Sequence, residues 1–255
     1  MKKFRIIGMV LAAIIMGVNF TSCNPDKDKP AKKLVKFTCS EKSEATFKYD
    51  EQGRLIECID YTIYNDKTDV YTYVWNENTI DFTLKLGGIY DLYFTLELEN
   101  GLVSKFTTES HFFNNFFKYN SYGRLIECSD IIRINSLEWD DDKLIKNHFE
   151  DPVYMPAIDT YSYDKNYTTE GYNPLIPFII TREFLYVAHP EIAGLATQKL
   201  YNNETSYAKT SDSEYTNSYK YEYGFDEDGY VNKVLVKKIE ENGETLIDEY
   251  LMIWE

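Results

Sequence analysis

Apolar and polar positions alternate along most of the chain from about residue 36 onward. Clusters of Gly, Asn and Asp interrupt this alternation roughly every ten to thirteen residues, the spacing of a β-meander. A period of two is typical of β-strands, and Gly, Asn and Asp favour tight turns. The pattern therefore predicts an all-β fold, an antiparallel meander of hairpins that forms a curled sheet or a partly open barrel.

One hairpin sequence occurs twice, as FKYDEQGRLIEC at 47–58 and FKYNSYGRLIEC at 117–128, with a weaker copy at 223–231. In each copy Asp or Asn opens a turn and Gly follows three positions later, which suits a type I turn with a left-handed Gly and a bulge. The turn residues are Asp50 and Gly53, Asn120 and Gly123, and Asp226 and Gly229. We expect three pairs across these turns to point into the core: Tyr49 with Leu55, Tyr119 with Leu125, and Phe225 with Val231.

A larger unit repeats as well, with a period of roughly seventy residues. In each unit the repeated hairpin is followed by one that a tryptophan leads, Trp75 in the first unit and Trp139 in the second. Such duplication predicts hairpins that pair side by side and bury one continuous face. Arg54 and Arg124 follow the turns directly, and we expect them to be solvated.

Cys58 and Cys128 occupy the same position of the repeat, so we expect both on strands and on equivalent faces. Small buried thiols are the simplest interpretation. A disulfide between them is the alternative in an oxidising compartment, and it requires the two hairpins to be neighbours.

The alternation breaks between residues 173 and 196. Asn173-Pro174 resembles a helix start, and the apolar residues that follow fall near helical spacing. His189-Pro190 ends the segment, because Pro disfavours a helical conformation of the residue before it. We expect one helix near 174–188, apolar on almost all sides and therefore buried, at an open end or on the concave face of the curled sheet.

The N-terminus has a different pattern. Lys2, Lys3 and Arg5 precede an apolar run that is too short and wrongly flanked for a stable membrane span, and the run ends in FTSC at Cys23. This resembles a bacterial lipoprotein signal, in which the chain is cleaved before a cysteine that is then acylated. An ordinary secretion signal in which Cys23 has no role is the alternative.

The chain is thus expected to contain a signal peptide at 1–22, an acylated Cys23 with a flexible tether at 23–33, and a single β-rich domain at 34–255. Acyl chains on Cys23 would hold the exported protein at the outer membrane, facing the periplasm or the cell surface. The tether is polar, charged and contains two prolines, so it has nothing to bury.

Charge and composition exclude some functions. The formal net charge is −15, and it becomes −18 once the three basic residues of the signal are removed. A chain this acidic is not expected to bind nucleic acid, whose phosphates need Lys and Arg. The 23 tyrosines and 15 phenylalanines supply either core and cross-strand packing or an exposed strip that stacks on sugar rings or peptide.

Catalytic, cofactor and metal motifs are missing from the sequence. His111, His148 and His189 are isolated, and the acidic runs at 140–142 and 226–228 lack the ligand spacing of a calcium loop. No nucleophile elbow or phosphate loop occurs. A membrane-spanning barrel is disfavoured because charges such as Lys48 and Lys105 interrupt the strands.

Two family resemblances follow from these motifs. The Tyr-Asp-x-x-Gly-Arg-Leu unit resembles the YD repeats of RHS-type proteins. Together with the lipoprotein signal, the Asn-Pro/His-Pro helix and the Phe-Asp-x-Asp-Gly-Tyr hairpin, it resembles the Bacteroidetes lipoproteins grouped as a domain of unknown function with a porin-like fold (DUF4595). That resemblance covers most of 36–254 and implies a curled antiparallel sheet approaching a barrel, with no catalytic residues to carry over.

Two functions fit these expectations. The first is a non-enzymatic binding or assembly module of the cell envelope, which presents aromatic residues to a glycan, a peptide or a partner protein. The alternative is a glycan hydrolase with two carboxylates inside the curled sheet. Buried carboxylates in a cleft would favour the enzyme, and exposed aromatic rings without them would favour binding.

Overall fold

The computed structural model describes residues 31–40, 42–63, 66–108, 115–130, 133–150, 156–165, 167–181, 184–209 and 213–255. The signal expected at 1–22, the lipid site at Cys23 and most of the tether lie outside these residues. By its contacts the chain divides into two units, Met1–Ala31 and Lys32–Glu255, and the second holds every element described below.

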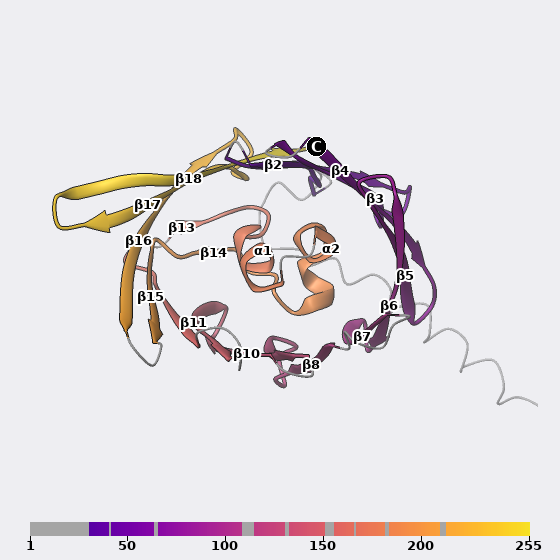
Figure 1. Ribbon diagram of the computed structural model, residues 1–255, viewed down its shortest axis with the longest axis horizontal. Coiled ribbons are helices and arrows are strands. Elements are labelled where there is room, and N and C mark those ends of the chain that lie inside the picture. The colour runs from indigo at the N-terminus through magenta and orange to yellow at the C-terminus, as the bar shows by residue number, and fades with distance from the viewer. Residues whose placement is uncertain are drawn as a thin grey trace, which may run out of the picture. The chain divides into compact units, whose positions relative to one another are not determined.

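Among the described residues of this second unit, sixteen strands form one closed antiparallel barrel (Figure 1). Strands adjacent in sequence pair with each other around the ring, except where the chain leaves the wall between β12 and β15. The strands of the wall are β1 (Leu34–Cys39), β2 (Ser43–Tyr49), β3 (Leu55–Thr62), β4 (Lys67–Trp75), β5 (Thr79–Leu86), β6 (Tyr90–Glu99), β7 (Leu102–Thr108), β8 (Asn115–Tyr119), β9 (Leu125–Ser129), β10 (Ile134–Asp140), β11 (Lys143–Glu150), β12 (Ala157–Ser162), β15 (Asn203–Lys209), β16 (Glu214–Phe225), β17 (Val231–Glu240) and β18 (Gly243–Trp254).

The barrel is closed by the pairing of its first and last strands. β1 pairs antiparallel with β18, with Phe37 opposite Met252 and Cys39 opposite Tyr250. The all-β antiparallel prediction is confirmed, but the expectation of a curled or partly open sheet is wrong. Closure removes the two free edges that an open sheet would expose, and no local pattern in the sequence marks a pairing between strands so far apart.

Between β12 and β15 the chain leaves the wall, and its described residues 167–181 and 184–200, which we call the plug, lie inside the ring (Figure 1). The plug contains β13 (Tyr167–Thr168), α1 (Leu175–Thr181), α2 (Phe184–Ala188), the 3-10 helix η2 (Pro190–Ala193) and β14 (Lys199–Leu200). Helical segments are thus present at Leu175–Thr181 and Phe184–Ala188, within the segment expected near 174–188, whereas 182–183 lie outside the described residues. The apolar character of the helical segments matches their place, since Leu175, Ile176 and Val187 are fully buried.

The repeated hairpins form the predicted bulged turns. Gly53, Gly123 and Gly229 have φ of 82°, 75° and 86°. In each hairpin the pairing between the two strands shifts by a bulge at the last two residues of the first strand. The opening Asp or Asn accepts main-chain N–H groups within its own turn; Oδ1 of Asn120, for example, binds Tyr122 and Arg124 at 3.0 Å each. Left-handed Gly and Asx bonding thus define these turns.

The six residues expected in the core pair across the turns in the predicted register, but they differ in burial. Leu55, Leu125 and Val231 are completely buried, whereas Tyr49 and Tyr119 are half-buried. Phe225 is 38% exposed, so its expected place in the core is wrong. Tyr223, two positions earlier, takes the inward place in the third copy.

The hydroxyl of Tyr223 makes the same kind of hydrogen bond as the hydroxyls of Tyr49 and Tyr119 in the other two copies. Its hydroxyl donates to the carbonyl of Tyr201 over 2.6 Å, as Tyr49 donates to Leu34 and Tyr119 to Val103 over 2.7 and 2.6 Å. Each tyrosine thus satisfies a main-chain carbonyl outside its own hairpin.

Candidate functional site

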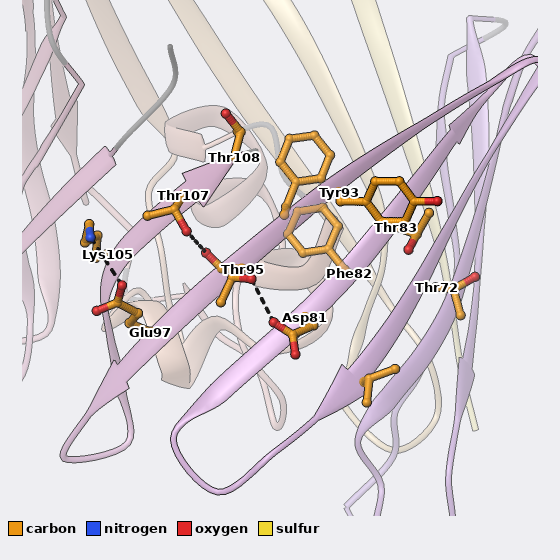
Figure 2. A pocket seen from close by; sticks show the side chains of 12 residues that line it. Thr72, Asp81, Phe82, Thr83, Tyr93, Thr95, Glu97, Lys105, Thr107 and Thr108 are labelled. Carbon is orange, nitrogen blue, oxygen red and sulfur yellow. Dashed lines mark hydrogen bonds and ion pairs between the residues drawn. The ribbon is translucent and has the colours of Figure 1, made fainter. Parts of the chain in front are cut away.

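An open groove of about 580 Å³ lies on the outer wall, across strands β4, β5, β6 and β7 (Figure 2). Strand alternation directs every second side chain outward here, and the register aligns these side chains in rows across the strands. One row consists of Val74, Asp81, Thr95 and Thr107, and the next of Thr72, Thr83 and Tyr93. These two rows combine threonines with one aromatic ring, that of Tyr93, and Phe82 and Phe94 also line the groove.

Hydrogen bonds hold the first row in place (Figure 2). The Thr107 hydroxyl donates to the carbonyl of Thr95 over 3.3 Å, and the Thr95 hydroxyl donates to Oδ1 of Asp81 over 2.7 Å. The amide of Asn76, in the β4–β5 turn, donates to Oδ2 of Asp81 over 2.8 Å. The Asp81 carboxylate is thus fixed in orientation by two strands and a turn.

Apolar surface and balanced charge complete the groove. Tyr93 is 48% exposed and Val74 is 57% exposed. At one end, Lys105 pairs with Glu97 over 3.2 Å. The groove offers a ring face, hydroxyls and a positioned carboxylate with little net charge, which suits a neutral, hydroxyl-rich ligand better than an ion.

Cross-strand ion pairs lie on other strands of the outer wall. They include Lys36–Glu44, Lys118–Glu127, Lys146–Glu138, Lys233–Glu249 and Lys237–Glu222, at 2.5 to 2.8 Å. Such exposed pairs add little stability individually. Their distribution does show that the outer wall carries charge on several of its strands.

The inner wall carries carboxylates of its own. Asp159 on β12 and Glu204 on β15 project inward on adjacent strands, beside Tyr161 and Tyr221. Burial raises the pKa of Glu204 to about 7, although a hydrogen bond from the Tyr221 hydroxyl opposes this. Burial also raises the pKa of Asp159, against hydrogen bonds from Ser206 and Asn147.

A second acidic pair faces inward on the neighbouring strands β3 and β4. Asp60 lies opposite Asp69 in the register. Burial, and then the charge of Asp69, raise the pKa of Asp60 to about 6. One of its carboxylate oxygens, Oδ1, is buried and has no hydrogen-bond partner within the described residues. The inner wall is therefore acidic on two sides of the barrel.

Three tryptophans bind the first residue after each repeated turn. The indole N–H groups of Trp75, Trp139 and Trp254 donate to the carbonyls of Leu55, Leu125 and Val231 over 2.7, 2.7 and 2.6 Å. The sequence suggested the correspondence of Trp75 and Trp139. The third member is Trp254, near the C-terminal end of β18.

The same three residues bind the plug through their main-chain N–H groups. Leu55 donates to Nε2 of His189 over 3.0 Å, and Val231 donates to the Thr169 hydroxyl over 3.2 Å. Leu125 donates to the carbonyl of Gly194 over 3.2 Å. Each repeated hairpin thus binds the plug through the first residue of its second strand.

Arg124 also contacts the plug, contrary to the expectation that it is solvated. Its guanidinium lies over the Trp139 ring at 5.2 Å and donates a hydrogen bond to the carbonyl of Ala196. Burial lowers the pKa of Arg124. Arg54, at the same position of the first repeat, instead pairs with Asp50 over 2.7 Å within its own turn.

The cysteines behave as structural thiols. Within the described residues no disulfide joins Cys39, Cys58 or Cys128; Cys58 is fully buried and Cys128 is half-buried. β3 and β9 are not adjacent in the barrel, so the alternative Cys58–Cys128 disulfide is wrong. Burial raises the pKa of Cys128 to about 12, which disfavours the reactive thiolate.

In the described part of the chain, no three His, Cys, Asp or Glu side chains are grouped to hold a metal ion. His111 lies outside that part, His148 is close to Glu150 on the outer wall, and His189 belongs to the plug. No helix among the described residues is long and apolar enough to cross a membrane.

Comparison with known proteins shows the fold. The barrel resembles porin-like proteins of Bacteroides. A crystal structure of a porin-like protein from Bacteroides uniformis ATCC 8492 aligns with a TM-score of 0.62 and 15% identity, over 89% of this chain and 99% of that one. A second, from Bacteroides vulgatus ATCC 8482, aligns with a TM-score of 0.59 and 12% identity, over 87% and 98%.

These likenesses support the porin-like fold that the sequence resemblance implied. No family model matches the chain, and no curated protein matches it either. The resemblances to DUF4595 and to YD repeats therefore stay predictions.

The sequence did not identify the groove or the inner-wall carboxylates. Tyr93, Asp81, Asp159 and Glu204 belong to no motif, and their places depend on strand register. Alternation alone assigns each of them to one face of a strand. Knowing which face is inside the barrel also requires the bulges, which shift the alternation within several strands.

Proposed function

We propose that this protein is a non-enzymatic binding module of the cell envelope, attached through lipid on Cys23, and that the groove on β4–β7 binds a neutral glycan. The observation that carries the proposal is the exposed Tyr93 ring beside rows of threonine hydroxyls and a positioned Asp81 carboxylate.

The chemistry of the groove matches that of a sugar. A pyranose ring has apolar C–H faces that stack on an aromatic ring, and hydroxyls around its edge that exchange hydrogen bonds with Thr and Asp. The Lys105–Glu97 pair neutralises both charges at one end, so the groove provides no unpaired cation for an acidic polymer. An uncharged glycan is therefore the favoured ligand class.

The ion pairs of the outer wall support a barrel that stands in water. A barrel in a bilayer needs an outward apolar band, because charges are costly at the membrane midplane. Here Lys36–Glu44 on β1 and β2 and Lys146–Glu138 on β10 and β11 place charges on well-separated parts of the wall. Lipid on Cys23 would then supply membrane attachment for a barrel that does not itself span the membrane.

A glycan array tests the groove. We expect the chain without its signal peptide to bind neutral glycans and the Tyr93→Ala variant to lose most of this binding, because the stacking face is gone. Tyr122→Ala is the matched control, since Tyr122 is 88% exposed on a turn outside the groove. Equal binding by the two variants, or no neutral glycan bound by the wild type, would contradict the proposal.

Metabolic labelling with an alkyne fatty acid tests the anchor in a bacterium that processes lipoproteins. We expect label on the wild-type chain and none on Cys23→Ser, whose protein should leave the membrane fraction. Cys58→Ser controls for labelling at other thiols. Unlabelled wild-type protein would remove the lipid anchor from the proposal and leave the groove unaffected.

The alternative remains a glycan hydrolase that uses Asp159 and Glu204. These neighbouring carboxylates on the inner wall are the observation in its favour. A glycosidase needs one protonated and one ionised carboxyl group, whereas burial raises the pKa of both here. Release of reducing sugar from a bound glycan, abolished by Glu204→Gln and unaffected by Tyr93→Ala, would favour the enzyme.

A further inference from the structure

Tyrosines and acidic residues form a continuous patch on the inner wall, and we call Asn147, Asp159, Tyr161, Tyr201, Glu204 and Tyr221 the inner cluster. The register joins its parts: Asn147 is opposite Asp159, and Tyr161 is opposite Glu204. Tyr201 lies 4.7 Å, between ring centroids, from both Tyr161 and Tyr221. β11, β12, β15 and β16 thus contribute to one site.

Several polar atoms of the inner cluster are buried without a partner. Within the described residues, the hydroxyls of Tyr161 and Tyr201 and Oδ1 of Asn147 have no hydrogen-bond partner. The three residues are only 6%, 0% and 5% exposed. Buried polar atoms in folded proteins are nearly always paired, so three in one patch indicate a bound species that completes their hydrogen bonds.

The chemistry of the cluster identifies that species as a hydrogen-bond donor with positive charge. Carboxylates, an amide oxygen and phenol oxygens all accept hydrogen bonds, and the tyrosine rings attract cations. On the inward face, the register places Lys238 opposite Tyr219, and Lys238 pairs with Glu240 at 3.7 Å. An anion would find no complementary charge here.

We propose that the inner cluster binds the primary ammonium group of a small amine. A primary ammonium has three N–H donors for the acceptors of Glu204, Asn147 and the tyrosines, whereas a quaternary ammonium has none. Metal ions fit less well, because the described residues hold no three grouped His, Cys, Asp or Glu ligands. Glu204 is half-buried, so the residue keeps some exposure to solvent. This site is separate from the outer groove and does not depend on glycan binding.

Isothermal titration of the chain lacking its signal peptide with propylammonium chloride tests the proposal, with tetramethylammonium and potassium chloride as comparison probes. We expect propylammonium to bind and the other two to bind at least about tenfold more weakly. Binding should strengthen between about pH 6 and pH 8, because burial raises the pKa of Glu204 to about 7 and the ionised form is the ligand for ammonium. The titratable groups around Glu204 are Asp159, Tyr161, Tyr201, Tyr219, Tyr221, Tyr223 and Tyr250.

Two variants separate a binding site from a structural cluster. Glu204→Gln keeps the shape and the acceptor but removes the charge, and Tyr161→Phe keeps the ring but removes the hydroxyl. Both should weaken propylammonium binding, whereas Glu138→Gln on the outer wall should not. Folding is checked by circular dichroism for each. Equal binding of all three probes, no binding by the wild type, or unchanged binding by a folded Glu204→Gln protein would overturn the proposal.

Discussion

The main-chain N–H of Leu55 donates a hydrogen bond to Nε2 of His189 over 3.0 Å. Because Nε2 is the acceptor, the ring proton is on Nδ1, which lies 2.7 Å from Oε1 of Glu191. Tyr49 and Trp75 contact the imidazole edge-on, with ring centroids at 5.9 and 5.2 Å. His189 thus joins the first repeated hairpin to the plug, and its role is structural.

Replacement of His189 by Phe should destabilise the barrel. The ring volume is kept, but the N–H of Leu55 loses its acceptor in a buried place, which costs about 1 to 3 kcal/mol. Urea unfolding measures the loss. His148→Phe on the outer wall is the matched control and should change the free energy of unfolding by about 0.5 kcal/mol or less. Equal losses in both variants would contradict this role of His189.

The repeat could be predicted from sequence because its determinants are local. Asp50 and Gly53 define a turn within four residues, and the same chemistry recurs at Asn120 and at Asp226. The hydrogen bonds that the indole N–H groups of Trp75 and Trp139 donate also recur at the same position of the seventy-residue unit. Closure of the barrel could not be predicted, since it depends on the pairing of Phe37 with Met252 across almost the whole chain.

Different roles for identical residues could not be predicted either. Arg54 and Arg124 have the same neighbours in sequence, yet one pairs within its turn and the other contacts the plug. The difference comes from the carbonyl of Ala196, which the plug brings to the second hairpin. The same holds for Glu204, whose inward position depends on the register of β15 against β12.

Arg124→Lys should therefore be more harmful than Arg54→Lys. A lysine cannot stack its charge over Trp139 as a planar guanidinium does and at the same time donate to the carbonyl of Ala196. We expect a loss of about 1 to 2 kcal/mol in the free energy of unfolding for Arg124→Lys. Arg54→Lys, whose side chain is 45% exposed, should cost less than about 0.5 kcal/mol. Similar losses measured by urea unfolding would show that Arg124 is solvated after all.

The raised pKa of Asp60 predicts that the stability of the protein depends on pH. Burial raises its pKa from 3.8 to about 6, so the folded protein binds more protons than the unfolded chain between about pH 4 and pH 6. The free energy of unfolding therefore falls as the pH rises through this range, and the loss is complete above it. Because Asp60 is only half-buried, we expect a loss of about 1 to 2 kcal/mol.

Asp60→Asn should remove this contribution. The variant should gain stability relative to the wild type at about pH 7 and show no gain at about pH 4, where the wild-type carboxyl is already protonated. Chemical denaturation at several pH values measures the difference. Asp91→Asn, on the outward face of β6, is the control for removal of a negative charge. A gain that is the same at every pH would exclude Asp60 as its source.

Gly194→Ala should separate the plug from the second repeated hairpin. Gly194 has φ of 63°, and an added Cβ would collide with the carbonyl oxygen of Gly123 and lie 2.9 Å from the main-chain N of Leu125. Both neighbours are backbone atoms of the second repeated hairpin, so neither can rotate away. The hydrogen bond from Leu125 to the Gly194 carbonyl should break together with this contact.

Gly88→Ala provides the comparison that isolates the collision. Gly88 also has a left-handed φ, 74°, but an added Cβ would meet nothing within 4 Å. This variant should lose only the backbone strain of about 1 to 2 kcal/mol. Gly194→Ala should lose at least about 2 kcal/mol more and become more sensitive to proteolysis within the plug. Equal losses would mean that the plug can move away from Gly123 at little cost, and the three hairpins would then not hold it rigidly.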